Sequence, residues 1–144
     1  MAIFAIALRT SISASGTAAA EIIAGANNAY RLLEFGVTIN AATASTYGLG
    51  QPAAKGTTPG TSSTVIAEDA GNTTAGASQV ALSWGTAPTA PTNFLRRVSL
   101  PGTIGAGIVW TFPRGRQQLK AVTDVLWNLA ASSAGADIWV VVDE

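Results

Sequence analysis

The chain has 144 residues and a mass of 14.5 kDa, with eight Lys+Arg, eight Asp+Glu, no His and no Cys. This length predicts one domain, residues 1–144. The missing Cys and His exclude disulfide scaffolds, ordinary zinc sites and histidine-based acid–base catalysis. A formal net charge of zero argues against a general nucleic-acid binder, which normally carries an excess of Lys and Arg.

The apolar content is high, at 48% of residues, but the longest uninterrupted apolar stretches are short, at residues 2–8 and 139–142. A membrane-spanning helix needs about 20 such residues, so no membrane segment is predicted. The first charge, Arg9, follows the first apolar run, whereas a signal peptide carries its positive charge before that run. With only 11% charged residues, the chain is expected to cover part of its surface in a larger assembly.

In the first half of the chain, alternating side chains predict strands at 3–13 and 30–40, the second of them central in its sheet. Residues 18–24 are ambiguous, because alanines favour a helix whereas Ile22 and Ile23 favour a strand. Gly25 and the asparagines at 27–28 then mark a turn.

The composition changes between residues 48 and 77, where glycine and proline recur every few residues. This density favours turns, so the segment is predicted to be a long exposed excursion with one short strand at 63–67. Long loops in compact domains are often functional, and here a loop that clasps a neighbouring molecule is expected.

The second half predicts strands again, joined by a rigid connector at 87–91. Pro113 is expected to end the strand that precedes it. Within the strand at 119–129, Val125, Trp127 and Leu129 share one face, opposite Asp124 and Asn128. The predicted strands lie at 78–84, 94–100, 107–112, 119–129 and 136–143. Together they indicate an all-β fold, a single antiparallel β-sandwich or jelly-roll-like domain.

Four tryptophans lie on four different predicted strands: Trp84, Trp110, Trp127 and Trp139. Each alternates in phase with Val, Leu or Ile, so a place in the core or at an interface is expected. Some of them would instead be sugar platforms if the protein were a lectin.

Arginines form the second group of interest. Arg96 and Arg97 are adjacent within a strand and should therefore face opposite ways. Arg114 and Arg116 follow Pro113 and form, with Lys120, a local basic cluster, which is either a solvated loop or a contact for an acidic partner. The candidate protein-contact residues are Phe94, Arg96, Arg97, Arg114 and Arg116.

Catalytic motifs are not recognisable in the sequence. The glycines at 102–107 lack the GxGxxG spacing of a dinucleotide site, and the carboxylates are too scattered for a glycosidase pair. A cupin-type metal site would need histidine. We therefore expect no enzyme, no catalytic residues, no cofactor and no metal.

Five segments resemble small all-β virion proteins of tailed bacteriophages, and the resemblance covers most of the chain outside residues 55–78. These segments are Tyr30–Gly36, Tyr47–Ala54, Phe94–Val98, Gly107–Gly115 and Ile138–Val142.

The resemblance implies a capsid decoration (cement) protein, a β-sandwich that is often trimeric and sits on the outer face of the head. It would be made in the host cytoplasm and would bridge neighbouring major capsid proteins, stabilising the head against internal DNA pressure. Two alternatives stay open at this point: a tail or head-fibre component, and a carbohydrate- or receptor-binding β-sandwich module.

Overall fold

A computed structural model describes residues 2–11, 15–118, 123–131 and 134–144. In this part of the chain eleven strands form two antiparallel sheets, and no helix is present. The strands are β1 (Ile3–Arg9), β2 (Thr17–Ile23), β3 (Tyr30–Ile39), β4 (Ser45–Gly50), β5 (Thr57–Thr64), β6 (Ile66–Ala67), β7 (Gln79–Thr86), β8 (Arg96–Leu100), β9 (Gly107–Gln118), β10 (Thr123–Asn128) and β11 (Ala136–Asp143).

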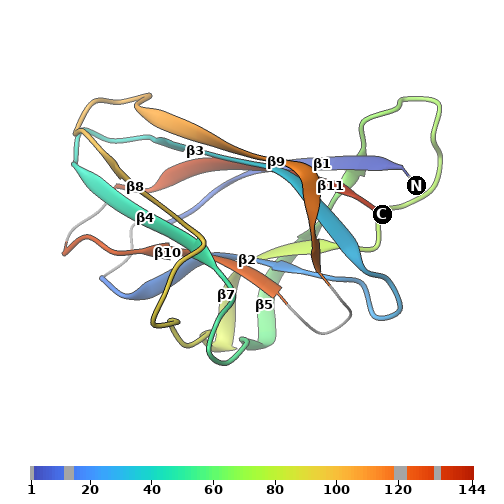
Figure 1. The fold of residues 1–144 in the computed structure, drawn as a ribbon, viewed down its shortest axis with the longest axis horizontal. Helices are drawn as coiled ribbons and strands as arrows, with labels where there is room; N and C mark the ends of the chain where they lie inside the picture. Colours follow the sequence, from blue (N-terminus) through green and yellow to red (C-terminus); the bar gives the residue numbers. More distant parts are fainter. Residues whose placement is uncertain (1, 12–14, 119–122, 132–133) are drawn as a thin grey trace.

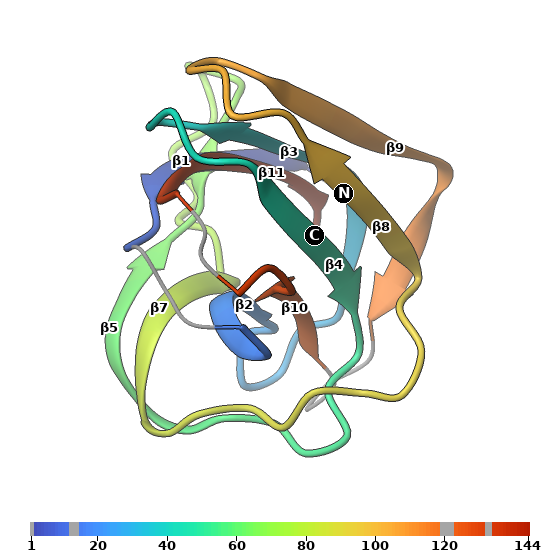
Figure 2. The same cartoon turned by 90° about the vertical axis from the view of Figure 1, so that its left-hand side faces the viewer.

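The two sheets pack face to face, which confirms the predicted β-sandwich. The first sheet has the strand order β6-β1-β11-β3-β9 and is the upper layer in Figure 1. The second has the order β5-β7-β2-β10-β4-β8. At one side of the sandwich the edge strands β8 and β9 lie next to each other, while β5 lies on the opposite side (Figure 2).

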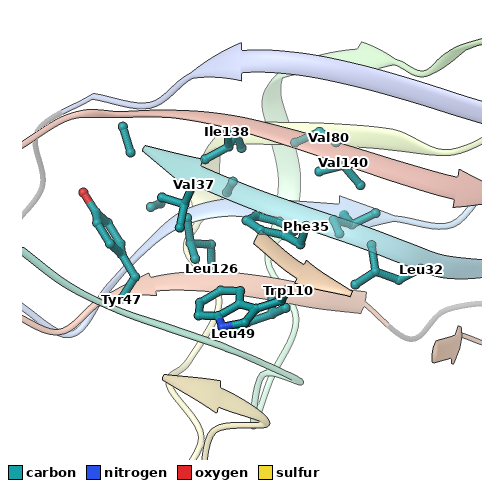
Figure 3. Close-up of a cluster of buried hydrophobic side chains, with 14 of the residues drawn as sticks. Leu32, Phe35, Val37, Tyr47, Leu49, Val80, Trp110, Leu126, Ile138 and Val140 are labelled. Atoms are coloured by element: carbon teal, nitrogen blue, oxygen red, sulfur yellow. The ribbon is translucent and has the colours of Figure 1, made fainter. Parts of the chain in front are cut away.

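The core lies between the sheets and is built from alternate residues of facing strands. Phe35 on β3 and Trp110 on β9 are opposite each other in register, with ring centroids 6.2 Å apart. Leu49 and Leu126 enter the same cluster from the second sheet (Figure 3). Burial of these apolar side chains is the main force that holds the sheets together.

A second, smaller apolar cluster, which we call the lower cluster, lies on the outer face of the second sheet. Trp127, the largest fully buried side chain of the described residues, packs there with Ala18 and Val125. Trp84, Phe94 and Leu129 pack around them. The segments at 51–56 and 87–93 run side by side beneath this face (Figure 2) and are joined by Ala53 N–H donating to Thr89 O at 2.9 Å. The second sheet is therefore covered on both faces near its centre.

The predicted excursion at 48–77 contains more regular structure than its composition suggests. Gly48 and Gly50 belong to β4, a buried strand between β10 and β8. Gly48 is required by packing rather than by a turn, because a Cβ there would lie 2.7 Å from the Phe94 ring. Residues 57–64 form an edge strand, β5, whose register shifts allow it to include Pro59.

The structure resolves one other element prediction and corrects a second. The ambiguous segment at 18–24 is a strand, because its alanines are buried where two sheets and the lower cluster meet, and tertiary packing overrides their helix propensity. Pro113 does not end its strand, since β9 is an edge strand that continues to Gln118. The start of the predicted strand at 119–129 and the end of that at 3–13 fall on 119–122 and 12–14, outside the described residues.

Candidate interaction surface

Two edge strands bring the predicted arginines to one side of the sandwich. Arg96 and Arg97 begin β8, the edge of the second sheet, while Arg114 and Arg116 lie in the second half of β9, the edge of the first. Residues that are about 20 positions apart in sequence therefore lie along one edge of the fold (Figure 2). We call this the arginine edge, defined by these four residues.

The adjacent arginines of β8 face opposite ways, as predicted. Arg96 shares a face with Val98, which packs against the main core, whereas Arg97 faces outward. The Arg96 guanidinium lies over the Phe112 ring, with Cζ 5.4 Å from the ring centroid, and its Nη1 donates to the Leu95 carbonyl at 3.1 Å. The cation–π contact holds this exposed side chain at the edge where β8 and β9 meet.

The chain of β9 bends between Arg114 and Arg116. Gly115 has φ +64°, a left-handed conformation that glycine adopts without steric cost. Before the bend Arg114 is exposed, whereas beyond it Arg116 turns inward and its Nε donates to Asp124 Oδ1 at 3.0 Å. Arg116 thus has an internal ionic partner, and Arg114 forms no salt bridge with the described residues.

Asp124 lies at the centre of a buried polar network. Its carboxylate is fully buried on β10 and accepts hydrogen bonds from Arg116 and from Gln118 Nε2. Gln51 Nε2 in turn donates to Gln118 Oε1 at 3.3 Å. Because a buried carboxylate needs such donors, the network connects β9 and β10 across the two sheets.

Burial of Tyr30 beside this network raises the pKa of its phenol well above the usual value near 10, and the negative charge of Asp124 adds to the effect. The unfolded state therefore loses this proton first as pH rises, so the resulting stabilisation of the native state is complete below about pH 10 and is lost above it. Urea unfolding at increasing pH above 10 is expected to show a steeper loss of stability for the wild type than for Tyr30→Phe. Equal slopes for the two proteins would contradict this assignment.

A pocket of about 580 Å³ opens on the arginine edge between β8 and β9. Its lining combines apolar groups with guanidinium groups: Leu95, Phe112 and Pro113 on one hand, Arg96, Arg114 and Arg116 on the other, together with Gly115 and Gln117. Such a lining suits a partner segment that carries both an apolar side chain and a carboxylate.

Phe94 does not belong to this pocket, although the sequence grouped it with the arginines. It is half-buried in the lower cluster with Leu129, against Gly48. Phe94 therefore supports the connector beneath the second sheet. Lys120, the third member of the predicted basic cluster, lies outside the described residues.

A second surface was not predicted from the sequence: the outer face of the first sheet carries an apolar region between charged residues, Arg9 and Asp137 at one end of the strands and Asp143 at the other. In register across it lie Ala7, Trp139, Gly36 and Val109. The next row begins with Ile66, Ala5 and Val141 and ends with the polar residues Glu34 and Thr111. Of the five large hydrophobic side chains that are exposed in the described structure, Ile3, Ile66 and Val109 lie on this face. We call it the apolar face. In the sequence, the apolar face is indicated by apolar residues on both sides of the first and last strands.

Trp139 is the largest side chain of the apolar face. Its ring lies flat on Gly36, where an added Cβ would be 1.9 Å from the indole, and its Nε1 donates to Glu34 Oε1 at 2.6 Å. The indole is thereby fixed against the sheet. Toward one end of the strands, the face carries the exposed ion pair of Arg9 and Asp137, with Nε and Oδ1 2.6 Å apart.

Glu21 is a buried carboxylate that the sequence analysis did not single out. It is 1% exposed and accepts hydrogen bonds from Trp84 Nε1 at 2.5 Å and from Thr123 Oγ1 at 2.8 Å. Gly56 closes over this pair, since a Cβ there would lie 2.3 Å from Trp84 Cδ1. These contacts join β2, β7 and β10 beneath the second sheet, which gives Glu21 a structural role.

Among the described residues, no helix has the length and apolar character needed to cross a lipid bilayer. No protein-family model, curated protein or solved structure matches the chain.

Proposed function

We propose that the protein is a structural virion protein, a capsid decoration (cement) subunit that binds the outer face of a phage head and bridges major capsid proteins. Its role is non-enzymatic, and it acts as a homo-oligomer, a trimer, made in the host cytoplasm. The observation that carries the proposal is the apolar face of the first sheet, on which three of the five exposed large hydrophobic side chains of the described residues lie, spread from β6 to β9. The bacteriophage virion proteins that the chain resembles are also small and all-β.

An antiparallel sheet normally presents a polar face to water, so an apolar outer face marks a surface that a partner covers. Four of the five strands are 7 to 12 residues long and the fifth, β6, has two; with strands about 4.8 Å apart, the face measures on the order of 500 Å². A stable pairwise interface buries about 800 Å² on each partner. One subunit would therefore bind weakly through this face alone.

A repeated lattice compensates for weak single contacts. Subunits joined to one another bind many equivalent sites on a head at once, so avidity replaces single-site affinity. A bridging subunit then needs one face for the head and an edge for its neighbours. The apolar face and the arginine edge meet this requirement on different sides of the sandwich (Figure 2).

The contacts of three of the four tryptophans do not favour the carbohydrate-binding alternative. Trp110 and Trp127 are buried and Trp84 packs in the second apolar cluster, so Trp139, flat on Gly36 at the outer face of the first sheet, is the one tryptophan placed like a sugar platform. A sugar platform needs an open aromatic face. A tail or head-fibre component belongs to the same structural class, and the location of the subunit in the particle separates it from a decoration protein.

The proposal is tested by coexpressing the chain with the major capsid protein encoded in the same genome and pelleting the assembled heads. Wild-type protein is expected to pellet with the heads, and Val109→Lys to bind at least about tenfold more weakly, because a charge would be desolvated in the contact. The matched control Thr92→Lys, on the exposed connector beneath the second sheet, is expected to bind like the wild type. Wild-type protein that stays in the supernatant, or equal binding of both variants, would overturn the proposal.

A further inference from the structure

The two lateral edges of the sandwich carry opposite charge. The arginine edge lies at β8 and β9, and β6 lies at the other end of the first sheet, four strands away. Directly after β6 come Glu68 and Asp69, both exposed. Neither carboxylate forms a salt bridge with the described residues, and the same holds for Arg96 and Arg114.

The β6 edge, where Glu68 and Asp69 lie, also carries the most exposed large hydrophobic side chain of the described structure. Ile66 is 69% exposed and lies two residues before Glu68. An apolar side chain and two carboxylates thus follow one another in Ile66–Asp69, which we call the acidic segment. Its chemistry matches the lining of the pocket on the arginine edge, which combines apolar side chains with guanidinium groups.

Backbone hydrogen bonds hold the acidic segment in place. Ile66 pairs with Ala5 of β1, and Glu68 N–H donates to the Ile3 carbonyl at 3.0 Å. The turn that follows is closed by Asp69, whose Oδ1 accepts from Gly71 N–H at 2.8 Å. Because the segment is ordered before any partner binds, docking it costs little conformational entropy.

We propose that two copies of the chain join head to tail, with the acidic segment of one copy in the arginine-edge pocket of the next. In this contact Ile66 packs on Leu95 and Pro113, the exposed apolar residues of the pocket. The carboxylates of Glu68 and Asp69 meet the guanidinium groups of Arg96 and Arg114. The inference rests on the homo-oligomer of the proposed function and names its contact.

The contact joins two different patches, so every copy uses both of its edges. Such an association closes into a ring when the rotation between copies returns to the start, and a trimer contains three identical contacts. Ile66, at the β6 edge, is the one residue of the apolar face that the pairing uses, and the rest of that face stays available for a head.

Charge reversal tests the pairing without any head present. The mass in solution is measured by size-exclusion chromatography with light scattering for the wild type, for Arg96→Glu/Arg114→Glu and for Glu68→Arg/Asp69→Arg. The wild type is expected to be an oligomer and both reversed proteins to be monomers of about 14.5 kDa, because each repels its own copies. The chain with all four substitutions is expected to regain the oligomer. A matched control, Arg9→Glu/Asp137→Arg, exchanges an ion pair outside both patches and should keep the wild-type mass.

A monomeric wild type, an oligomer that survives both reversals, or a four-substitution chain that stays monomeric would each overturn the pairing. A cysteine pair gives a second test that does not reverse charge, since the natural chain has no Cys. Ile66→Cys/Pro113→Cys is expected to form disulfide-linked oligomers on oxidation, whereas Ile66→Cys/Thr92→Cys should give no ladder beyond dimers. If the pairing fails while wild-type protein still pellets with heads, only the head-to-tail contact is wrong. If pairing succeeds without pelleting, the proposed function is wrong.

Discussion

Replacing Trp127 by alanine is expected to lower the free energy of unfolding by about 3–5 kcal/mol. The indole is fully buried and fills the centre of the lower cluster between Ala18, Val125 and the connector that carries Phe94. Its loss leaves a large cavity where the second sheet meets that connector. Urea unfolding followed by far-ultraviolet circular dichroism measures the change.

Trp127→Phe is the matched control. The indole Nε1 is buried and forms no hydrogen bond with the described residues, so phenylalanine loses no such bond and keeps much of the volume. We expect it to cost less than about 2 kcal/mol. An alanine variant within about 1 kcal/mol of the wild type would show that the connector does not cover this face.

Replacing Arg116 by methionine is expected to lower the free energy of unfolding by about 3–5 kcal/mol, because it leaves the fully buried carboxylate of Asp124 without its cationic partner. Gln118 remains as a donor but carries no charge. Arg116 itself keeps 24% of its side chain exposed, so the opposite change is milder. Asp124→Asn leaves a guanidinium that solvent still reaches, and we expect a smaller loss of stability from it.

The double variant Arg116→Met/Asp124→Asn completes the cycle. It removes the stranded charge and is expected to be more stable than Arg116→Met alone. The four proteins are compared by urea unfolding. If the double variant were less stable than Arg116→Met, Asp124 would not be the group that makes Arg116 necessary.

Side-chain alternation was sufficient to predict the sandwich, and the last strand shows why. Ile138, Val140 and Val142 of β11 are all buried in the core, as their alternation with Asp137, Trp139 and Val141 indicates. The same reasoning correctly placed Val125 and Trp127 on one face of β10, opposite Asp124 and Asn128. The period-two pattern predicted these faces correctly because it follows directly from which side chains are buried.

The prediction for residues 48–77 was wrong where it took every glycine and proline as a sign of a turn. Gly48 lies within a buried strand because the Phe94 ring approaches its backbone, and Pro59 lies in an edge strand that tolerates a missing N–H. Both reasons depend on neighbours that are distant in sequence. Local composition cannot distinguish a glycine needed for close packing from one needed for a turn.

The candidate site was predicted in part. The opposite directions of Arg96 and Arg97 followed from strand geometry, whereas the role of Arg116 depends on Asp124, whose position opposite β9 is set by the packing of two sheets. The apolar face required the register of β1, β11, β3 and β9. No single strand reveals which of its two apolar sides is the outer one.

The proposed assembly assigns separate roles to separate surfaces. The apolar face is for the head, and the arginine edge and the acidic segment join neighbouring copies. Between them the core and the Asp124 network keep the two sheets in fixed relation, so that both surfaces are presented in a constant geometry. Rigid subunits of this kind lose little entropy when they assemble on a lattice.

The most direct measurement is electron cryo-microscopy of heads assembled from the coexpressed major capsid protein and this chain. The proposal predicts β-sandwich density on the outer surface of the head, with the first sheet facing the shell and contacts that bridge neighbouring capsid subunits. Heads without added density, or sandwich density attached only at a tail, would contradict a role in capsid decoration.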